Sequence, residues 1–340
     1  MAGRKLNRRQ TWRVQKIQQE RAKRAARKDE QTEQLFNDQE LGPEQEGLVT
    51  AHFGTQVEVV AASDETRSER IRCHLRANLG SLVTGDRVVW RYHSGHGTGV
   101  VVAVLERTSE LARPDASGNT KAIAANIDQI IIVFAPYPEP HNNLIDRYLV
   151  AAHALAIPAL LLLNKQDRID ASNQAEINQL LAIYQRLDYP VLAVSTKTGQ
   201  GIEALKQQLA GHTSIFVGQS GVGKSSLVNT LLPGVDARVG ELSELTQKGT
   251  HTTTTAQLFH FPAGGDLIDS PGIREFGLWH MDEEEVFAGF KELAALHGQC
   301  KFRDCHHQQE PGCAVLNAAE AGQIQPQRLA SYRHIINSLE

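Results

Sequence analysis

The stretch Gly218-Gln-Ser-Gly-Val-Gly-Lys-Ser225 decides the fold, because it joins an apolar strand pattern, 214–217, to a helical pattern, 226–232. Its glycines let the backbone turn so that N–H groups point inward, where they can bind phosphate oxygens. Lys224 adds a positive charge over the outer phosphates, and the Ser225 hydroxyl at the helix start can ligate Mg²⁺. The helix N-terminus also favours an anion. The stretch therefore predicts a cradle for a nucleoside triphosphate.

The segment Asn164-Lys165-Gln-Asp167 indicates which base the cradle accepts. It follows the apolar pattern 157–163, which places it at the carboxyl end of a buried strand, where open parallel sheets bind ligands. The Asp167 carboxylate can accept from N1–H and the 2-amino group of guanine, and adenine offers neither donor. Asn164 would brace the phosphate loop and meet the guanine edge, while the stem of Lys165 lies along the base. These roles favour guanine.

A third segment, Ser195-Thr196-Lys197, follows another strand pattern, 189–194. Its backbone is suited to a contact with the guanine O6. Strands that alternate with helices along 126–232 predict a parallel, doubly wound α/β sheet. The three motifs together predict a GTP-binding domain with this fold.

Two loops after the cradle are predicted to close on the γ-phosphate. The first ends in Gly249-Thr-His-Thr-Thr-Thr-Thr255, where either Thr252 or Thr253 is placed to ligate Mg²⁺. In the second, Asp269 reaches Mg²⁺ through water and the Gly272 N–H senses the γ-phosphate, whose loss would release both loops. The predicted GTP-binding residues are Asn164, Lys165, Asp167, Ser195, Thr196, Lys197, Gly218, Gln219, Ser220, Gly221, Val222, Gly223, Lys224, Ser225, Ser226 and Gly272.

The order of these parts differs from that of ordinary small GTPases, in which the phosphate loop comes first and the guanine motifs last. Here the guanine motifs at 164–167 and 195–197 precede the cradle at 218–225 and both switch loops. We therefore predict a circularly permuted domain, an arrangement that is tolerated because domain termini tend to lie close together at the surface. The second switch then ends the domain, so that the segment after it is coupled directly to the γ-phosphate.

With this order and its flanking segments, the chain resembles the bacterial family of the ribosome small-subunit-dependent GTPase A, from about Gly47 to the end. The resemblance implies an enzyme that converts GTP and water to GDP and phosphate late in maturation of the 30S ribosomal subunit. It implies stimulation by 30S, contact with 16S rRNA and release of another assembly factor. We expect a monomer.

The composition is consistent with several domains. A chain of 340 residues with 41% apolar residues can bury two or three cores. The sequence lacks the long apolar run of a membrane span, and its N-terminus is polar and basic, so we expect a cytoplasmic protein with no membrane partner. The expected parts are a basic arm and linker at 1–46, an OB barrel at 47–113, the permuted GTPase domain at 114–277 and a helical zinc-binding domain at 278–340.

The barrel is predicted from period-two patterns in five short segments, 47–54, 56–60, 70–76, 86–92 and 99–107. Several arginines alternate with apolar positions there, which would place them on a common outer face; they are Arg70, Arg72, Arg76, Arg87 and Arg91. Such a face is either a solvated surface or an RNA contact. The family resemblance implies 16S rRNA.

The N-terminal arm carries a strong positive charge that the net charge of −4 hides. Residues 1–28 hold eleven Lys and Arg and one acidic residue, Glu20. A block of this kind is often only solvated. Beside an RNA-binding barrel it can instead neutralise phosphates and fold into a helix from Arg13 to Arg27 on contact.

A cluster of cysteines and histidines lies near the C-terminus. Three thiolates and one imidazole within 300–313 suit a closed tetrahedral Zn²⁺ site, which is structural because no position is left for substrate; the cysteines are Cys300, Cys305 and Cys313. Spacing alone does not choose between His306 and His307. The family pattern, Cys-x₄-Cys-x-His-x₅-Cys, implies His307.

The residue that orients the hydrolytic water is not evident from the motifs. Where Ras-like proteins carry a glutamine this chain has Ile273, which cannot hydrogen-bond, so slow intrinsic turnover is expected. One hypothesis gives His251 this role once a partner orders the loop, with Lys224 as the other catalytic residue. The alternative is a solvated His251 without a catalytic role.

Two other functions are compatible with the same motifs. The protein could be a GTP-gated RNA-binding adaptor in which hydrolysis only times its departure. It could also be a tRNA-modification or translation GTPase, which predicts stimulation by tRNA or 70S ribosomes.

Overall fold

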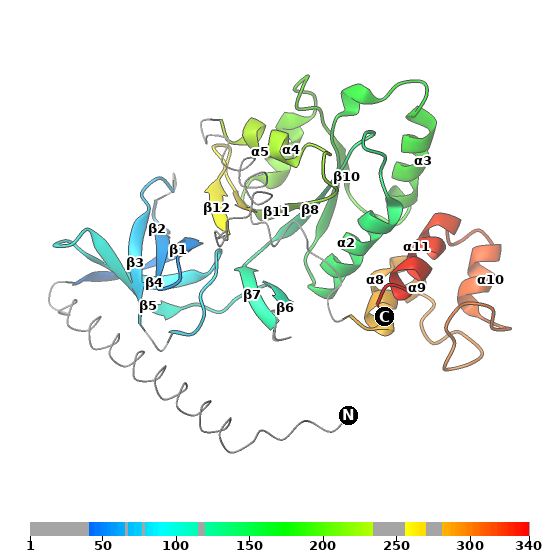
Figure 1. The fold of residues 1–340 in the computed structure, drawn as a ribbon, viewed down its shortest axis with the longest axis horizontal. Helices are drawn as coiled ribbons and strands as arrows, with labels where there is room; N and C mark the ends of the chain where they lie inside the picture. The colour runs from blue at the N-terminus through cyan, green and yellow to red at the C-terminus, as the bar shows by residue number, and fades with distance from the viewer. Residues whose placement is uncertain are drawn as a thin grey trace, which may run out of the picture. The chain divides into compact units, whose positions relative to one another are not determined.

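The computed structural model describes residues 41–64, 67–76, 79–114, 120–233, 256–269 and 281–339. Its contacts divide the chain into two units. One unit runs to Leu82 and includes Asp86–Glu106, and the other consists of Val83–Gly85 and the chain from Arg107 onward. Figure 1 labels the helices and strands of both units.

The first unit is a closed, five-stranded β-barrel. Its strands pair in the order β1-β2-β3-β5-β4, and β4 pairs again with β1. β3 and β5 run parallel, whereas the other neighbours are antiparallel. The predicted OB-like barrel is confirmed. Its strands are β1 (Leu41–His52), β2 (Gln56–Ala61), β3 (Ile71–Leu75), β4 (Arg87–His93) and β5 (Thr98–Val104).

The first strand begins at Leu41 rather than Gly47, so the prediction of a linker over 41–46 is wrong. Glu44, Gln45 and Glu46 read as polar linker residues, yet they pair with β4, and the Leu41 side chain is buried. A strand with charged outward side chains has the composition of a linker. Only the partner strand distinguishes the two cases.

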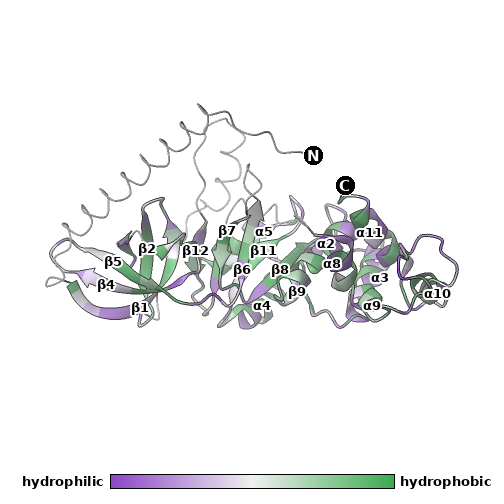
Figure 2. Ribbon diagram, turned by 90° about the horizontal axis from the view of Figure 1, so that it is seen from below, coloured by the Kyte–Doolittle hydropathy of each residue, from purple (hydrophilic) through white to green (hydrophobic). Residues whose placement is uncertain are grey.

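The second unit contains the predicted parallel sheet, with strand order β10-β9-β8-β11-β13-β12. All neighbours in it are parallel except β12, which is antiparallel to β13. Every side chain of β8 is buried, and β8 and β9 are among the strongly apolar segments in Figure 2. The strands are β8 (Gln129–Phe134), β9 (Ala159–Leu163), β10 (Val191–Ala193), β11 (Thr213–Val217), β12 (Gln257–His260) and β13 (Asp266–Asp269).

Four α-helices accompany this sheet: α2 (Asn142–Ala154), α3 (Gln174–Gln185), α4 (Ile202–Leu209) and α5 (Lys224–Leu231). A 3₁₀ turn, η3 (Gln166–Arg168), follows β9. A two-stranded hairpin of β6 (Glu110–Pro114) and β7 (Thr120–Ala125) was not predicted from the sequence.

The C-terminal helices form a small module that packs on α2 (Figure 1). The approach is close, because a Cβ on Gly289 would lie 2.8 Å from Cγ1 of Val150 on α2. The helices are α8 (Glu283–Gly289), α9 (Lys291–Ala294), α10 (Ala314–Glu320) and α11 (Pro326–Ile336). Among the described residues, no helix is both long and apolar enough to cross a bilayer.

A capping box starts this module. The Asp282 carboxylate accepts from the Glu285 N–H at 2.9 Å, and the Glu285 carboxylate accepts from the Asp282 N–H at 3.0 Å. These bonds satisfy backbone donors that the first turn leaves free.

We expect Asp282→Ala to destabilise α8 by about 1 kcal/mol, because it removes the cap acceptor. Amide hydrogen exchange in α8 should then become about fivefold faster. Glu284→Ala is the matched control, since Glu284 lies in the same first turn but outside the box. Equal exchange rates in the two variants would contradict the prediction.

Candidate functional site

The predicted nucleotide motifs meet at one edge of the sheet. β9, β10 and β11 are parallel, and their carboxyl ends lead directly into Asn164, Ser195 and Gly218. β13 runs the same way and ends at Asp269. The structure therefore brings together side chains that are far apart in sequence, at the edge where parallel sheets bind ligands.

The phosphate loop depends on positions without side chains. Gly218, Gly221 and Gly223 have φ values of 139°, 82° and 95°, which disfavour other residues. A Cβ on Gly218 would lie 2.0 Å from the Val133 carbonyl oxygen. The Lys224 Nζ donates to the carbonyls of Gly218 at 2.6 Å and Gln219 at 2.8 Å, so its ammonium group lies over the loop.

The guanine motif is joined to the phosphate loop by two side chains. Asn164 is fully buried, and its Nδ2 donates to the Val222 carbonyl at 2.9 Å. The Lys165 Nζ donates to the carbonyls of Gly221 at 2.6 Å and Tyr137 at 3.0 Å. The brace expected of Asn164 is present, and the contact with Tyr137 adds the segment after β8, which the motifs do not reveal.

Asp167 is exposed, and its Oδ1 accepts from the Ser195 hydroxyl at 2.6 Å. That hydrogen bond, with smaller contributions from the charges of Lys197 and Arg168, lowers the pKa of Asp167. Ser195 Oγ in turn accepts from the Thr198 N–H at 3.1 Å. The motif Ser195-Thr196-Lys197 predicts only a backbone contact. The hydroxyl that orients Asp167 is not evident from the motif, because this contact spans 28 residues.

Two of the predicted magnesium ligands lie close together. Ser225, at the start of α5, and Asp269, at the end of β13, line the same small cavity of about 10 Å³ beside Lys224. A hydroxyl and a carboxylate are the oxygen ligands that Mg²⁺ prefers. Ser220 belongs to the loop itself, and Ser226 is exposed on α5. His251, Thr252, Thr253 and Gly272 lie outside the described residues, as does Ile273.

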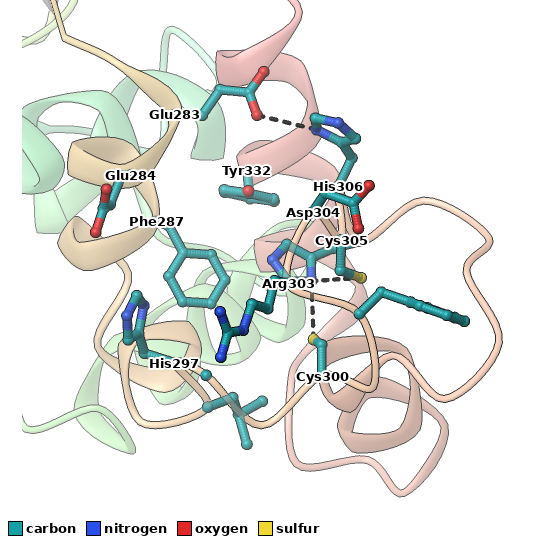
Figure 3. Close-up of a pocket in the computed structure, with 14 residues that line it drawn as sticks. Glu283, Glu284, Phe287, His297, Cys300, Arg303, Asp304, Cys305, His306 and Tyr332 are labelled. Carbon is teal, nitrogen blue, oxygen red and sulfur yellow. Dashed lines mark hydrogen bonds and ion pairs between the residues drawn. The ribbon is translucent and has the colours of Figure 1, made fainter.

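The four predicted zinc ligands converge in the C-terminal module; their ligand atoms lie within 4.8 Å of one another, and the residues are Cys300, Cys305, His307 and Cys313. Figure 3 labels two of them, Cys300 and Cys305. His307 Nδ1 lies 3.6 Å from Sγ of Cys300 and of Cys305, and 3.3 Å from Sγ of Cys313. The Cys300 and Cys313 sulfurs are 3.9 Å apart.

These distances fit a tetrahedral ion. With Zn–S near 2.3 Å and Zn–N near 2.0 Å, ideal angles give about 3.8 Å between sulfurs and about 3.5 Å from sulfur to nitrogen. Burial lowers the pKa of His307, which favours the neutral ring that a metal requires. The geometry selects Nδ1 as the donor. His306 instead has its Nδ1 3.3 Å from the Glu283 carboxylate, so it is not part of the cluster.

Residues around the cluster hold its loops in place. The Phe287 ring stacks on His307 with centroids 5.0 Å apart, and Arg333 donates to the His307 carbonyl at 3.1 Å. The Glu310 carboxylate accepts from the N–H groups of His306 at 2.9 Å and Gln308 at 2.8 Å. A cavity of about 470 Å³ opens beside the cluster, as Figure 3 shows.

The arginines of the barrel have intramolecular partners. Arg72 and Arg70 both pair with Glu58, at 3.1 Å and 3.7 Å. Arg91 donates to the Gly42 carbonyl at 2.8 Å. The Arg72 guanidinium also lies 3.6 Å from the ring centroid of Phe53, an exposed aromatic residue. The Arg72 guanidinium therefore stacks on the Phe53 ring while its charge is paired with Glu58.

Comparisons with known proteins agree with this arrangement. The model of the RsgA GTPase family matches residues 104–279. A protein from Ectopseudomonas mendocina, named small ribosomal subunit biogenesis GTPase RsgA, is 63% identical over 339 residues, covering 100% of this chain and 98% of its own.

Two solved structures are similar over most of the chain. The YjeQ structure from Thermotoga maritima is 34% identical with a TM-score of 0.71, covering 87% of this chain and 99% of that one. YloQ, described as a circularly permuted GTPase, is 27% identical with a TM-score of 0.69, covering 87% and 95%. The predicted fold class is confirmed, including the circular permutation.

We expect Asn164→Ala to weaken binding of labelled GDP at least tenfold, because it leaves the buried Val222 carbonyl without its donor, at a cost of about 1–3 kcal/mol. Isothermal titration measures the dissociation constant. Asn178→Ala, an exposed asparagine on α3, is the control and should bind as the wild type does. Equal affinity of both variants would exclude this bracing role.

The ionised carboxylate of Glu310 is expected to help the cluster retain a metal. Hydrogen bonds from its own backbone N–H, and from those of His306, Gln308 and Gln309, lower its pKa from 4.5 to about 2. Its ionised form therefore stabilises the loop above pH 4.5, and this contribution is lost as the pH falls towards 2.

Glu310→Gln should release the metal bound by the cluster to a chelator about tenfold faster than the wild type. The ratio of the two rates should stay constant between pH 8 and pH 5, because Glu310 remains ionised in the folded protein throughout that range. Asp304→Asn, which changes an exposed acid of the same loop, should release the metal at the wild-type rate. If the two variants released the metal at equal rates by pH 6, this role of the ionised Glu310 carboxylate would be contradicted.

Proposed function

Since this chain belongs to the RsgA GTPase family and is a GTPase, we propose that it acts in late maturation of the 30S ribosomal subunit, binding 16S rRNA and responding to 30S. The observation that carries the proposal is the Asn164 bond to Val222, which joins a guanine motif to a phosphate loop in one site. The name of the full-length relative supports the ribosomal role.

The nucleotide site would use the predicted residues in distinct roles. Asp167, held by Ser195, would accept from the guanine N1–H and 2-amino groups. The loop N–H groups of 218–225 and Lys224 would bind the phosphates. Ser225 and Asp269 would hold Mg²⁺, together with Thr252 or Thr253 and the γ-phosphate. When bound, Mg²⁺ would neutralise charge that develops on the phosphates.

The metal of the Cys₃His cluster is proposed to be Zn²⁺ in a structural role. All four positions of a tetrahedron are taken by protein atoms, so none is left for substrate. The metal would fix the loops between short helices.

The RNA-binding role is proposed for the barrel and for the basic arm at 1–28. Strands and loops of OB folds commonly bind oligonucleotides, and the exposed Phe53 with Arg72 offers a stacking surface. The ion pairs of Arg70 and Arg72 with Glu58 leave less free charge on this face than the sequence suggests. The arm would therefore supply most of the phosphate neutralisation.

Hydrolysis is proposed to require a partner. Ile273 cannot orient water, and His251 remains the candidate for that task once 30S orders its loop. Another assembly factor would leave the particle when the γ-phosphate is lost. A cytoplasmic monomer fits this role.

We expect GTP turnover by the purified protein to rise at least about a hundredfold with 30S, because an ordered loop would position the attacking water. Phosphate release is measured at fixed salt, alone and with 30S, 50S, 70S or tRNA, with ATP as control. ATP should remain inert. Stimulation by tRNA or 70S instead would favour a tRNA-modification or translation GTPase.

The same assay tests the two remaining hypotheses. His251→Ala should lose the 30S-stimulated part of kcat while keeping its affinity for GDP, and a fully stimulated variant would reject the role of His251. If a non-hydrolysable GTP analogue traps the protein on 30S without blocking maturation, the protein is a GTP-gated adaptor whose hydrolysis only times departure.

A further inference from the structure

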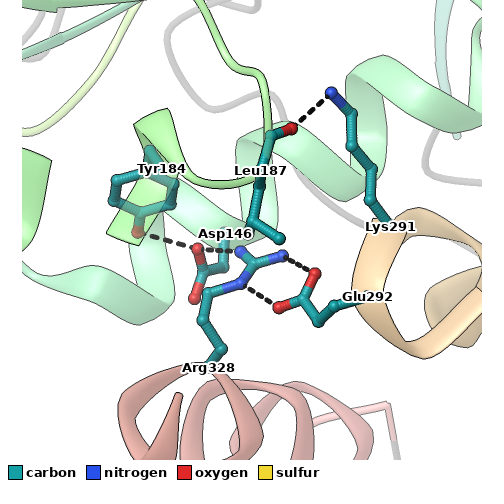
Figure 4. A network of polar contacts seen from close by, with 6 residues as sticks. All are labelled: Asp146, Tyr184, Leu187, Lys291, Glu292 and Arg328. Carbon is teal, nitrogen blue, oxygen red and sulfur yellow. Dashed lines mark hydrogen bonds and ion pairs between the residues drawn. The ribbon is translucent and has the colours of Figure 1, made fainter. Parts of the chain in front are cut away.

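A buried polar network joins the C-terminal module to the α/β domain. Arg328 on α11 and Asp146 on α2 are only 2% and 0% exposed, and they form a direct ion pair. Arg328 also binds Glu292 on α9 in a bidentate manner, with Nε–Oε1 at 2.6 Å and Nη2–Oε2 at 3.0 Å. Tyr184 on α3 donates to Asp146 at 2.8 Å. Figure 4 shows all four side chains meeting around the guanidinium group.

Residues of the C-terminal module itself fix the orientation of the Arg328 guanidinium group. The bidentate bond to Glu292 lies within the C-terminal module and fixes the plane of the guanidinium group that also pairs with Asp146. The ring of Phe290 lies 4.4 Å from the guanidinium carbon and covers one face of it. Burial raises the pKa of Asp146, and the charge of Arg328 opposes that rise. Loss of the contact would leave a buried charge unpaired, so the module favours one position on α2.

The same helix also contacts the phosphate loop. Tyr148 lies two positions after Asp146, which places it on the opposite side of α2. It is buried, and its hydroxyl is hydrogen-bonded to the backbone of Gly218. α2 begins directly after the segment whose Tyr137 carbonyl shares the Lys165 ammonium with Gly221. One face of α2 therefore supports the nucleotide loop while the other holds Arg328.

We propose that Asp146 and Arg328 are positioning residues for the nucleotide site, which act by fixing α2 between the phosphate loop and the zinc module. Nucleotide binding and docking of the module are then coupled, and the coupling is reciprocal. This route runs through α2 and does not require the second switch. The inference rests on the proposed nucleotide site.

The decisive variant is Asp146→Asn, which keeps the shape and an acceptor for Tyr184 but removes the charge that Arg328 faces. We expect the dissociation constant for fluorescent GDP to rise about fivefold or more, with KM for GTP raised and zinc content unchanged. His153→Ala is the matched control, because His153 is an exposed residue of the same helix. It should bind GDP as the wild type does.

A second measurement separates coupling from general destabilisation. In the wild type, GDP should slow amide hydrogen exchange in α11, far from the nucleotide; in Asp146→Asn this effect should be lost at a temperature where the variant is folded. Tyr184→Phe, which removes only one hydroxyl from the network, should give a smaller change in the same direction and provides the test if Asp146→Asn does not fold.

Three outcomes would overturn the inference. If both variants bind GDP with wild-type affinity and GDP still protects α11, the network is only a structural anchor, and the nucleotide site stands. If GDP does not protect α11 in the wild type although it binds tightly, the coupling is absent. Wild-type protein that fails to bind GDP would reject the nucleotide site and this coupling together.

Discussion

The hydrogen bond from the Asn164 amide to the Val222 carbonyl is the interaction on which the nucleotide edge depends. β9 and β11 are not neighbours, because β8 lies between them, so the bond reaches across the end of a third strand. It fixes the distance between a motif that would bind a base and one that would bind phosphates. Gly223 must lack a side chain for this purpose, since a Cβ there would lie 2.5 Å from Asn164 Nδ2. Neither motif can therefore take its shape without the other.

The dependence on strand ends explains why the domain tolerates a permuted chain order. A parallel sheet gathers the residues at its carboxyl edge whatever sequence order the strands have. Here β8 and β11 form the centre, and the guanine motifs follow β9 and β10 at one side. Permutation changes only the connections between the strands and helices, and these lie at the surface. It also places the end of the domain after β13, where a further module can be attached.

Local patterns in the sequence were sufficient for much of the fold and the site. Apolar runs such as 130–134 and the glycines of 218–223 reveal their strand and loop, because the forces involved act over a few residues. The three cysteines of the Cys₃His cluster were predicted for the same reason, since they lie within one short segment, whereas the choice of His307 over His306 came from the family pattern. The beginning of β1 was missed because its identity depends on pairing with β4, and its own side chains are polar. The Ser195 hydroxyl was assigned no role because the Asp167 carboxylate it orients belongs to another strand end.

The buried network at Arg328 cannot be predicted from local sequence patterns. Asp146 and Arg328 are 182 residues apart, and each reads as an ordinary surface residue of an amphipathic helix. The module's helices are short, from 4 to 11 residues, so a packing partner outside the module adds to its core. Because α2 is that partner, part of the module's core belongs to the α/β domain. An apolar contact would tolerate sliding, whereas a guanidinium held by two carboxylates does not. Any movement that follows loss of the γ-phosphate must therefore carry α2 along with the module or break this network.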